Sequence, residues 1–128
     1  MASGKNEPVF SCRAYPDFCR TGKRGQYFDV RVFASIEDLR KATGAVDAAA
    51  CFDGFDHHRL GNRTRKIGVL SFYYPKIGAG IVSHEATHAA LYWASKNGLD
   101  DEELVALAVG EIVRQVFSAL AEVNYLNL

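Results

Sequence analysis

Residues 84–88 read His-Glu-Ala-Thr-His, which is the arrangement His-Glu-x-x-His. An α-helix turns by about 100° per residue, so residues four apart lie on one face, one turn from each other. His84 and His88 can therefore direct one nitrogen of each imidazole ring at a single metal ion. Glu85 lies beside them, where its carboxylate can polarise a metal-bound water without binding the metal itself. The pattern predicts a hydrolytic metal site.

Apolar residues flank this motif on both sides along the chain. A helix that is apolar nearly all round is usually a buried helix. Burying two imidazoles and a carboxylate without partners costs free energy, and a bound metal ion removes that cost. The competing interpretation leaves the same three side chains satisfied by hydrogen bonds in the core. We favour the interpretation in which these side chains bind a metal ion.

A catalytic zinc site needs a third protein ligand and one position that stays open to water. No histidine follows the motif, which leaves the downstream glutamates Glu102, Glu103, Glu111 and Glu122. If two helices form an antiparallel hairpin that turns near residues 98–99, the rise of 1.5 Å per residue puts Glu111 opposite the motif. Glu103 would lie more than about 10 Å away, and with Asp100 as N-cap it would complete a capping box. Glu111 is the predicted third ligand, with Glu103 in reserve.

Hydrophobic patterning predicts the elements that must position these side chains. Four strands are expected, within residues 9–25, 27–34, 45–52 and 66–74. A short helix begins after Ser35, a good N-cap, and stops at Gly44. Two long helices are expected at residues 81–97 and from about 100 to 123. This order predicts an α+β fold, in which a small mixed or antiparallel sheet with a short helix packs against two long C-terminal helices.

The composition limits the class of protein. A chain of 128 residues, 48% of them hydrophobic, fits a single domain at residues 9–128, after a leader at residues 1–8 that we expect to be flexible. Fifteen basic and fifteen acidic side chains cancel, which argues against a nucleic-acid partner. We expect no membrane-spanning helix, and residues 1–8 lack the apolar stretch of a secretory signal. Cys12, Cys19 and Cys51 are expected to be reduced thiols, so the predicted location is the cytoplasm.

These residues resemble the zincin metallopeptidases, and a glutamate as third ligand points to the gluzincin branch. The order of elements is similar to that of the small minigluzincin-like metallopeptidases encoded by bacteriophages. The resemblance implies that Zn²⁺ is held by His84, His88 and Glu111. It also implies that Glu85 is the general base for hydrolysis of a peptide bond in a protein or peptide substrate. For a phage protein the location would be the host cytoplasm.

The resemblance also implies a place for the substrate. In such enzymes the strand before the metal helix is an edge that an extended peptide joins by main-chain hydrogen bonds, a role that would fall to residues 69–73. The position four after Glu111 is Gln115, where larger gluzincins often have an aspartate. Candidates for oxyanion support or substrate contact are His57, His58, Tyr73 and Tyr74. Tyr73 and Tyr74 should point to opposite faces of their strand.

Two rival functions remain open. The first is a zinc-stabilised module that binds a protein partner without turnover. Glu85 argues against this module, because a purely structural site needs no acid beside its first ligand. The second is a metal-free phage interaction protein that binds a host protein through the basic segment at residues 59–66.

Overall fold

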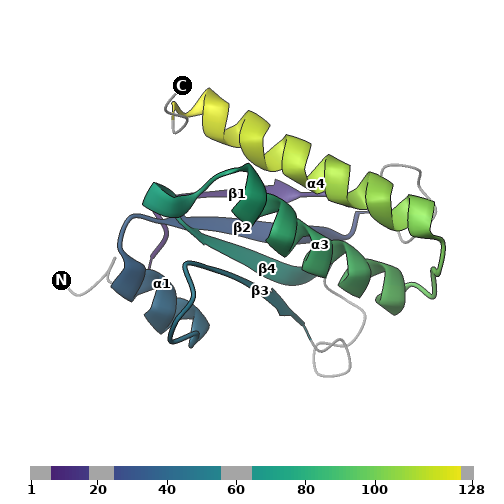
Figure 1. The fold of residues 1–128 in the computed structure, drawn as a ribbon, viewed down its shortest axis with the longest axis horizontal. Helices are drawn as coiled ribbons and strands as arrows, with labels where there is room; N and C mark the ends of the chain where they lie inside the picture. The colour runs from purple at the N-terminus through teal and green to yellow at the C-terminus, as the bar shows by residue number, and fades with distance from the viewer. Residues whose placement is uncertain (1–6, 18–24, 56–64, 125–128) are drawn as a thin grey trace.

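The computed structural model describes residues 7–17, 25–55 and 65–124. Its elements are β1 (Phe10–Ala14), β2 (Tyr27–Phe33), α1 (Ile36–Thr43), β3 (Ala50–Gly54), β4 (Lys66–Tyr73), the 3₁₀ turn η1 (Tyr74–Lys76), α3 (Ala79–Lys96) and α4 (Glu102–Glu122). The predicted α+β fold is confirmed: a small mixed sheet carries a short helix and packs against two long C-terminal helices (Figure 1). The strand expected at residues 45–52 begins only at Ala50, because the chain first bends at residues 46–47 after leaving α1.

The four strands lie in the order β1-β2-β4-β3. The pairs β1–β2 and β3–β4 are antiparallel, whereas β2 and β4 are parallel. The strand that leads into α3, β4, is therefore in the interior of the sheet, with β2 on one side and β3 on the other. The edges are formed by β1 and β3, which lie three strand spacings apart, or about 14 Å.

Side-chain alternation gives the sheet two different faces. On β2, the fully buried Phe28, Val30 and Val32 point to the face that α3 and α4 cover. Phe33 points the other way, toward α1, whose Leu39 is also fully buried. Figure 1 shows α3 and α4 side by side on one side of the sheet and α1 on the other.

Small residues allow α3 to pack closely on the sheet and on α4. Its buried face includes Ala86, Ala89, Ala90 and Ala94, together with the larger Val82 and Trp93. The helix ends where Gly98 adopts a left-handed φ of 67°, and the next N–H, of Leu99, donates to the carbonyl of Ala94. The predicted turn between the two long helices is thus confirmed.

The second long helix, α4, buries a single stripe formed by Ala108, Ile112, Val116 and Leu120. These residues are four apart and point to α3 and the sheet. Among the described helices, α4 alone is long and apolar enough to cross a membrane, judged by length and composition only. The expectation that no helix of this chain spans a membrane stays a prediction. In the structure, α4 packs against α3 and β1.

Side-chain caps begin both α1 and α4. Ser35 caps α1 as predicted, because its hydroxyl accepts from the N–H of Asp38 at 3.3 Å. For α4 the predicted N-cap was wrong by one residue: the cap is Asp101 and not Asp100. Asp101 has extended backbone, and its side chain accepts from the N–H of Glu103 at 2.8 Å. Glu103 is therefore the second helical residue, and the capping box expected from the sequence does not form.

The caps give a stability test at the start of α4. Replacing Asp101 with alanine removes a cap hydrogen bond and a favourable charge at the helix N-terminus, so the free energy of unfolding should fall by about 1 kcal/mol. Asp100→Ala is the matched control and should change it by less than about half as much. Chemical denaturation of both variants measures the difference. Equal losses would show that the cap is not at Asp101.

Candidate metal and hydrolysis site

The helix α3 brings the two histidines of the motif together. The Nε2 atoms of His84 and His88 lie 3.3 Å apart, and their ring centroids are 4.9 Å apart. Two imidazole ligands of a tetrahedral zinc ion, each about 2.0–2.1 Å from the metal, have nitrogens about 3.3–3.4 Å apart. The same separation also suits a hydrogen bond between two neutral rings. The pair thus has the geometry of half a tetrahedral metal site.

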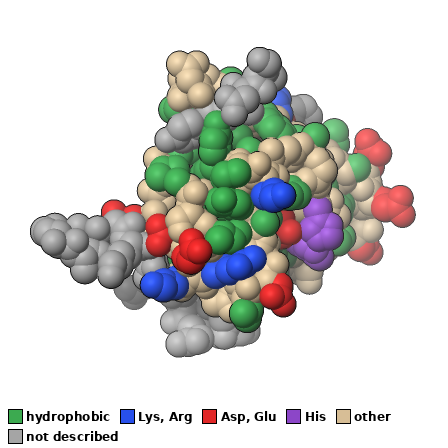
Figure 2. All heavy atoms as spheres, turned by 60° about the vertical axis from the view of Figure 1, so that its left-hand side comes forward, with side chains coloured by type: hydrophobic (Ala, Val, Ile, Leu, Met, Phe, Trp, Pro, Cys, Tyr) green, Lys and Arg blue, Asp and Glu red, His purple; other side chains and the backbone are tan. Residues whose placement is uncertain are grey.

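Contrary to the sequence expectation, the two histidines are not buried. Both are exposed, with 67% of the His84 side chain accessible to solvent. Figure 2 shows the described histidines as one purple patch on the surface. The reason lies in the helix itself, because its small, apolar face occupies the side toward the sheet and the histidines fall outside it. The free-energy cost of burial therefore does not argue for a metal at the histidines.

Glu85 is the buried member of the motif. Only 9% of the residue is exposed, and Oε2 lies 3.9 Å from Nε2 of His84. No other described residue donates a hydrogen bond to this carboxylate. On β3, the pKa of the Cys51 thiol is raised by burial first, and then by the charges of Glu85 and Asp53. Glu85 therefore lies on the flank of α3 that faces β3, beside the histidine pair.

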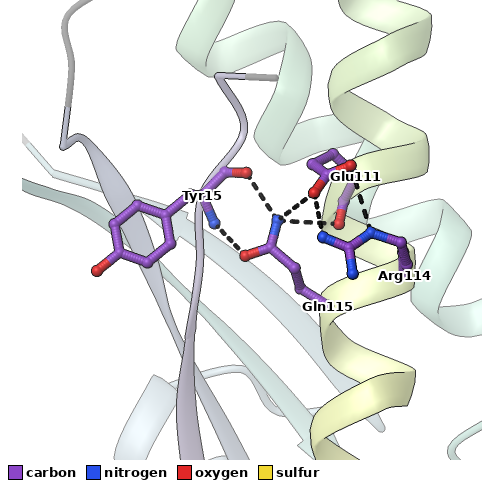
Figure 3. A network of polar contacts seen from close by, with 4 residues as sticks. All are labelled: Tyr15, Glu111, Arg114 and Gln115. Atoms are coloured by element: carbon purple, nitrogen blue, oxygen red, sulfur yellow. Dashed lines mark hydrogen bonds and ion pairs between the residues drawn. The ribbon is translucent and has the colours of Figure 1, made fainter. Parts of the chain in front are cut away.

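The structure does not bring Glu111 to the histidines. Its carboxylate, 18% exposed, is paired with Arg114 and accepts from the side-chain amide of Gln115 at 3.3 Å (Figure 3). The same amide group of Gln115 accepts from the N–H of Tyr15 at 2.9 Å and donates to its carbonyl at 2.8 Å. Tyr15 directly follows β1, so Glu111 belongs to the β1 side of the molecule, whereas Glu85 faces β3 on the opposite edge.

The other proposed ligand, Glu103, is exposed in the first turn of α4. Among the residues that the structure describes, no three His, Cys, Asp or Glu side chains come together as a metal-binding group. The described site thus consists of two candidate ligands, His84 and His88, and one candidate base, Glu85.

The substrate edge expected at residues 69–73 was wrong, because β4 is paired on both sides and has no free edge. The edge strand next to α3 is β3. Its hydrogen bonds to β4 start from Ala49 and end at Phe55, so odd-numbered residues pair with β4. The main-chain groups of Ala50, Phe52 and Gly54 consequently point outward from the sheet.

The remaining candidates are distributed as follows. Tyr73 follows Phe72 at the end of β4 and so points to the face away from α3, while Tyr74 packs against the main core. His57 and His58 lie outside the described residues, as do residues 59–64 of the basic segment.

The described cysteines are poor nucleophiles. Burial, helped by the charge of Asp29, raises the pKa of Cys12 to about 11, and the pKa of Cys51 is also raised. Both thiols therefore stay protonated at neutral pH, where a reactive cysteine needs a lowered pKa. Cys19 lies outside the described residues.

Sequence reasoning missed two residues that shape this part of the molecule. Gln115 joins α4 to the end of β1, and Tyr92 joins α3 to the end of β3. The spacing of Tyr92, four residues after His88, was the available signal, because it puts both side chains on neighbouring parts of one helix face. Nothing in the spacing of Gln115 reveals its distant partner.

No family model, no curated protein and no solved structure matches the chain.

The position of Glu111 gives a direct test. We expect Glu111→Gln to leave zinc affinity within about twofold of the wild type, because the carboxylate is paired with Arg114 and Gln115 on the β1 side of the molecule. Gln115→Ala should also leave zinc affinity unchanged but lower the free energy of unfolding by about 1–2 kcal/mol, since two hydrogen bonds to Tyr15 are lost. Competition with a chromophoric chelator and urea denaturation measure the two quantities. A tenfold loss of zinc affinity in Glu111→Gln would show that Glu111 reaches the histidines after all.

Proposed function

We propose that this protein is a zinc-dependent hydrolase of peptide bonds, with His84 and His88 as metal ligands and Glu85 as general base. The observation that supports the proposal most is the separation of 3.3 Å between the two Nε2 atoms, with a buried carboxylate beside them. The donor set fits zinc, because imidazole nitrogen is among its preferred ligands. It fits only in part, since the described residues supply no third protein ligand.

The chemistry divides between the metal and the chain. Bound zinc supplies a Lewis acid that polarises a carbonyl oxygen or a water molecule. Glu85 takes up a proton from the attacking water, and its low exposure keeps competing water away from the carboxylate. The carboxylate of Glu85 can then deliver the proton to the leaving amine. The histidines, exposed on the same flank, leave room for the substrate to approach.

The edge strand β3 supports an extended peptide as the substrate. Outward main-chain groups at Ala50, Phe52 and Gly54 can pair with a peptide laid along the edge. Such pairing would use backbone groups alone and would therefore demand little of the peptide sequence. The peptide bond would then lie near Glu85, which faces the same strand.

A second candidate function is favoured by one observation. The carboxylate of Glu111 is paired with Arg114, and the described residues supply no third ligand of the kind that a zinc peptidase normally has. A metal-free interaction protein has no need of that ligand. It would also be consistent with a hydrogen bond between two neutral histidine rings. A zinc-stabilised binding module is less well supported, because structural sites usually have four protein ligands.

The proposal is tested by Glu85→Gln in zinc-loaded protein, with self-quenched fluorescein-labelled casein as the substrate. The variant should keep its zinc and lose at least about 100-fold in turnover, because an amide cannot accept the proton. Glu103→Gln, an exposed glutamate at the start of α4, is the matched control and should cleave at the wild-type rate.

Each contrary outcome points to a different error. Cleavage by Glu85→Gln at the wild-type rate would show that another group is the base. Loss of zinc in Glu85→Gln would make Glu85 a ligand. Zinc-loaded wild-type protein that cleaves no casein would favour a binding function over hydrolysis.

A further inference from the structure

Tyr92 connects the metal helix to the edge strand. It lies four residues after His88, one turn further along α3, and its hydroxyl donates a hydrogen bond to the carbonyl of Phe55. Phe55 directly follows β3. The ring of Tyr92 also meets that of Phe52 edge to face, with centroids 5.5 Å apart. A single side chain therefore contacts both the middle and the end of β3.

The strand backbone lies directly against this ring. A Cβ atom added to Gly54 would lie 2.5, 2.6 and 2.9 Å from three ring carbons of Tyr92, distances that real side chains do not adopt. Glycine is thus required where the strand backbone approaches the tyrosine so closely. The ring is also contacted by Lys96, whose ammonium lies 5.3 Å from the ring centroid.

The helix α3 and the strand β3 run in the same direction, and the two segments that face each other have similar lengths. Glu85 influences Cys51, and Tyr92 touches Gly54. The seven residues from Glu85 to Tyr92 rise about 10 Å along the helix, and the three residues from Cys51 to Gly54 advance about 10 Å along the strand. The contact at Tyr92 therefore fixes the distance between α3 and β3 at a point about 10 Å along the helix from Glu85.

We propose that Tyr92 is a positioning residue that holds the edge of β3 at the distance from Glu85 and the histidines at which an extended peptide binds. This inference rests on the proposed function. Without the hydroxyl, the end of β3 loses its hydrogen bond to α3. A peptide joining its edge would then have to order the strand as it binds. The loss should appear in substrate binding and not in the chemical step.

The test compares zinc-loaded Tyr92→Phe with the wild type. With labelled casein as substrate, KM should rise about fivefold, the effect of one lost hydrogen bond, while kcat and zinc content stay within about twofold. Amide exchange at Cys51, Asp53 and Phe55, which pair with β4, should become about fivefold faster.

Tyr27→Phe is the matched control. It removes a hydroxyl on the opposite face of the sheet but keeps the ring that packs under Arg13, so KM and β3 exchange should not change.

A second variant perturbs the same contact from the strand. Gly54→Ala should displace the Tyr92 ring and raise KM at least as much, again with zinc retained. An unchanged KM in Tyr92→Phe, or a fall in kcat at constant KM, would overturn the positioning role. If wild-type protein binds zinc but cleaves no casein, the proposed function fails, and the exchange measurement alone then decides whether Tyr92 holds β3. Unaltered exchange in that case would contradict the inference.

Discussion

The close packing of α3 against the sheet determines the rest of the structure. Four alanines on its buried face, Ala86, Ala89, Ala90 and Ala94, bring the helix close both to the strands and to α4. Larger side chains there would move the helix outward and separate it from β3, where Gly54 leaves no spare room for the Tyr92 ring. The same packing fixes the rotation of α3 about its axis. That rotation decides which side chains of the motif meet solvent.

The rotation gives the motif an uneven environment. With about 100° between successive residues, Glu85 falls at the margin of the buried face and His84 falls outside it. The carboxylate is consequently 9% exposed, whereas the neighbouring imidazole side chain is 67% exposed. A carboxylate shielded from bulk water beside exposed imidazoles is the arrangement that the proposed hydrolysis would need. The uneven environment also explains why the expectation of buried histidines failed although the helix is mostly apolar.

Much of the fold could be predicted from local patterns. Strand alternation, the cap at Ser35 and the stop at Gly98 depend on neighbouring residues, so the sequence alone was sufficient for the element order and the helix hairpin. Such local patterns do not predict how segments far apart in the sequence pack against each other. The rise per residue predicts the level of Glu111 along the hairpin, but it does not predict on which side of α3 the second helix packs. The pairing of β4 on both sides likewise depends on β2 and β3, which no local signal in β4 reveals.

The central claim is that His84 and His88 hold a metal ion, and elemental mass spectrometry tests it most directly. The measurement uses protein purified without chelator, with His88→Ala prepared in parallel. The account predicts one zinc per chain in the wild type and none in the variant, since one imidazole cannot retain the ion alone. Absence of metal from both proteins would contradict it, and the separation of 3.3 Å between the rings would then be a hydrogen bond.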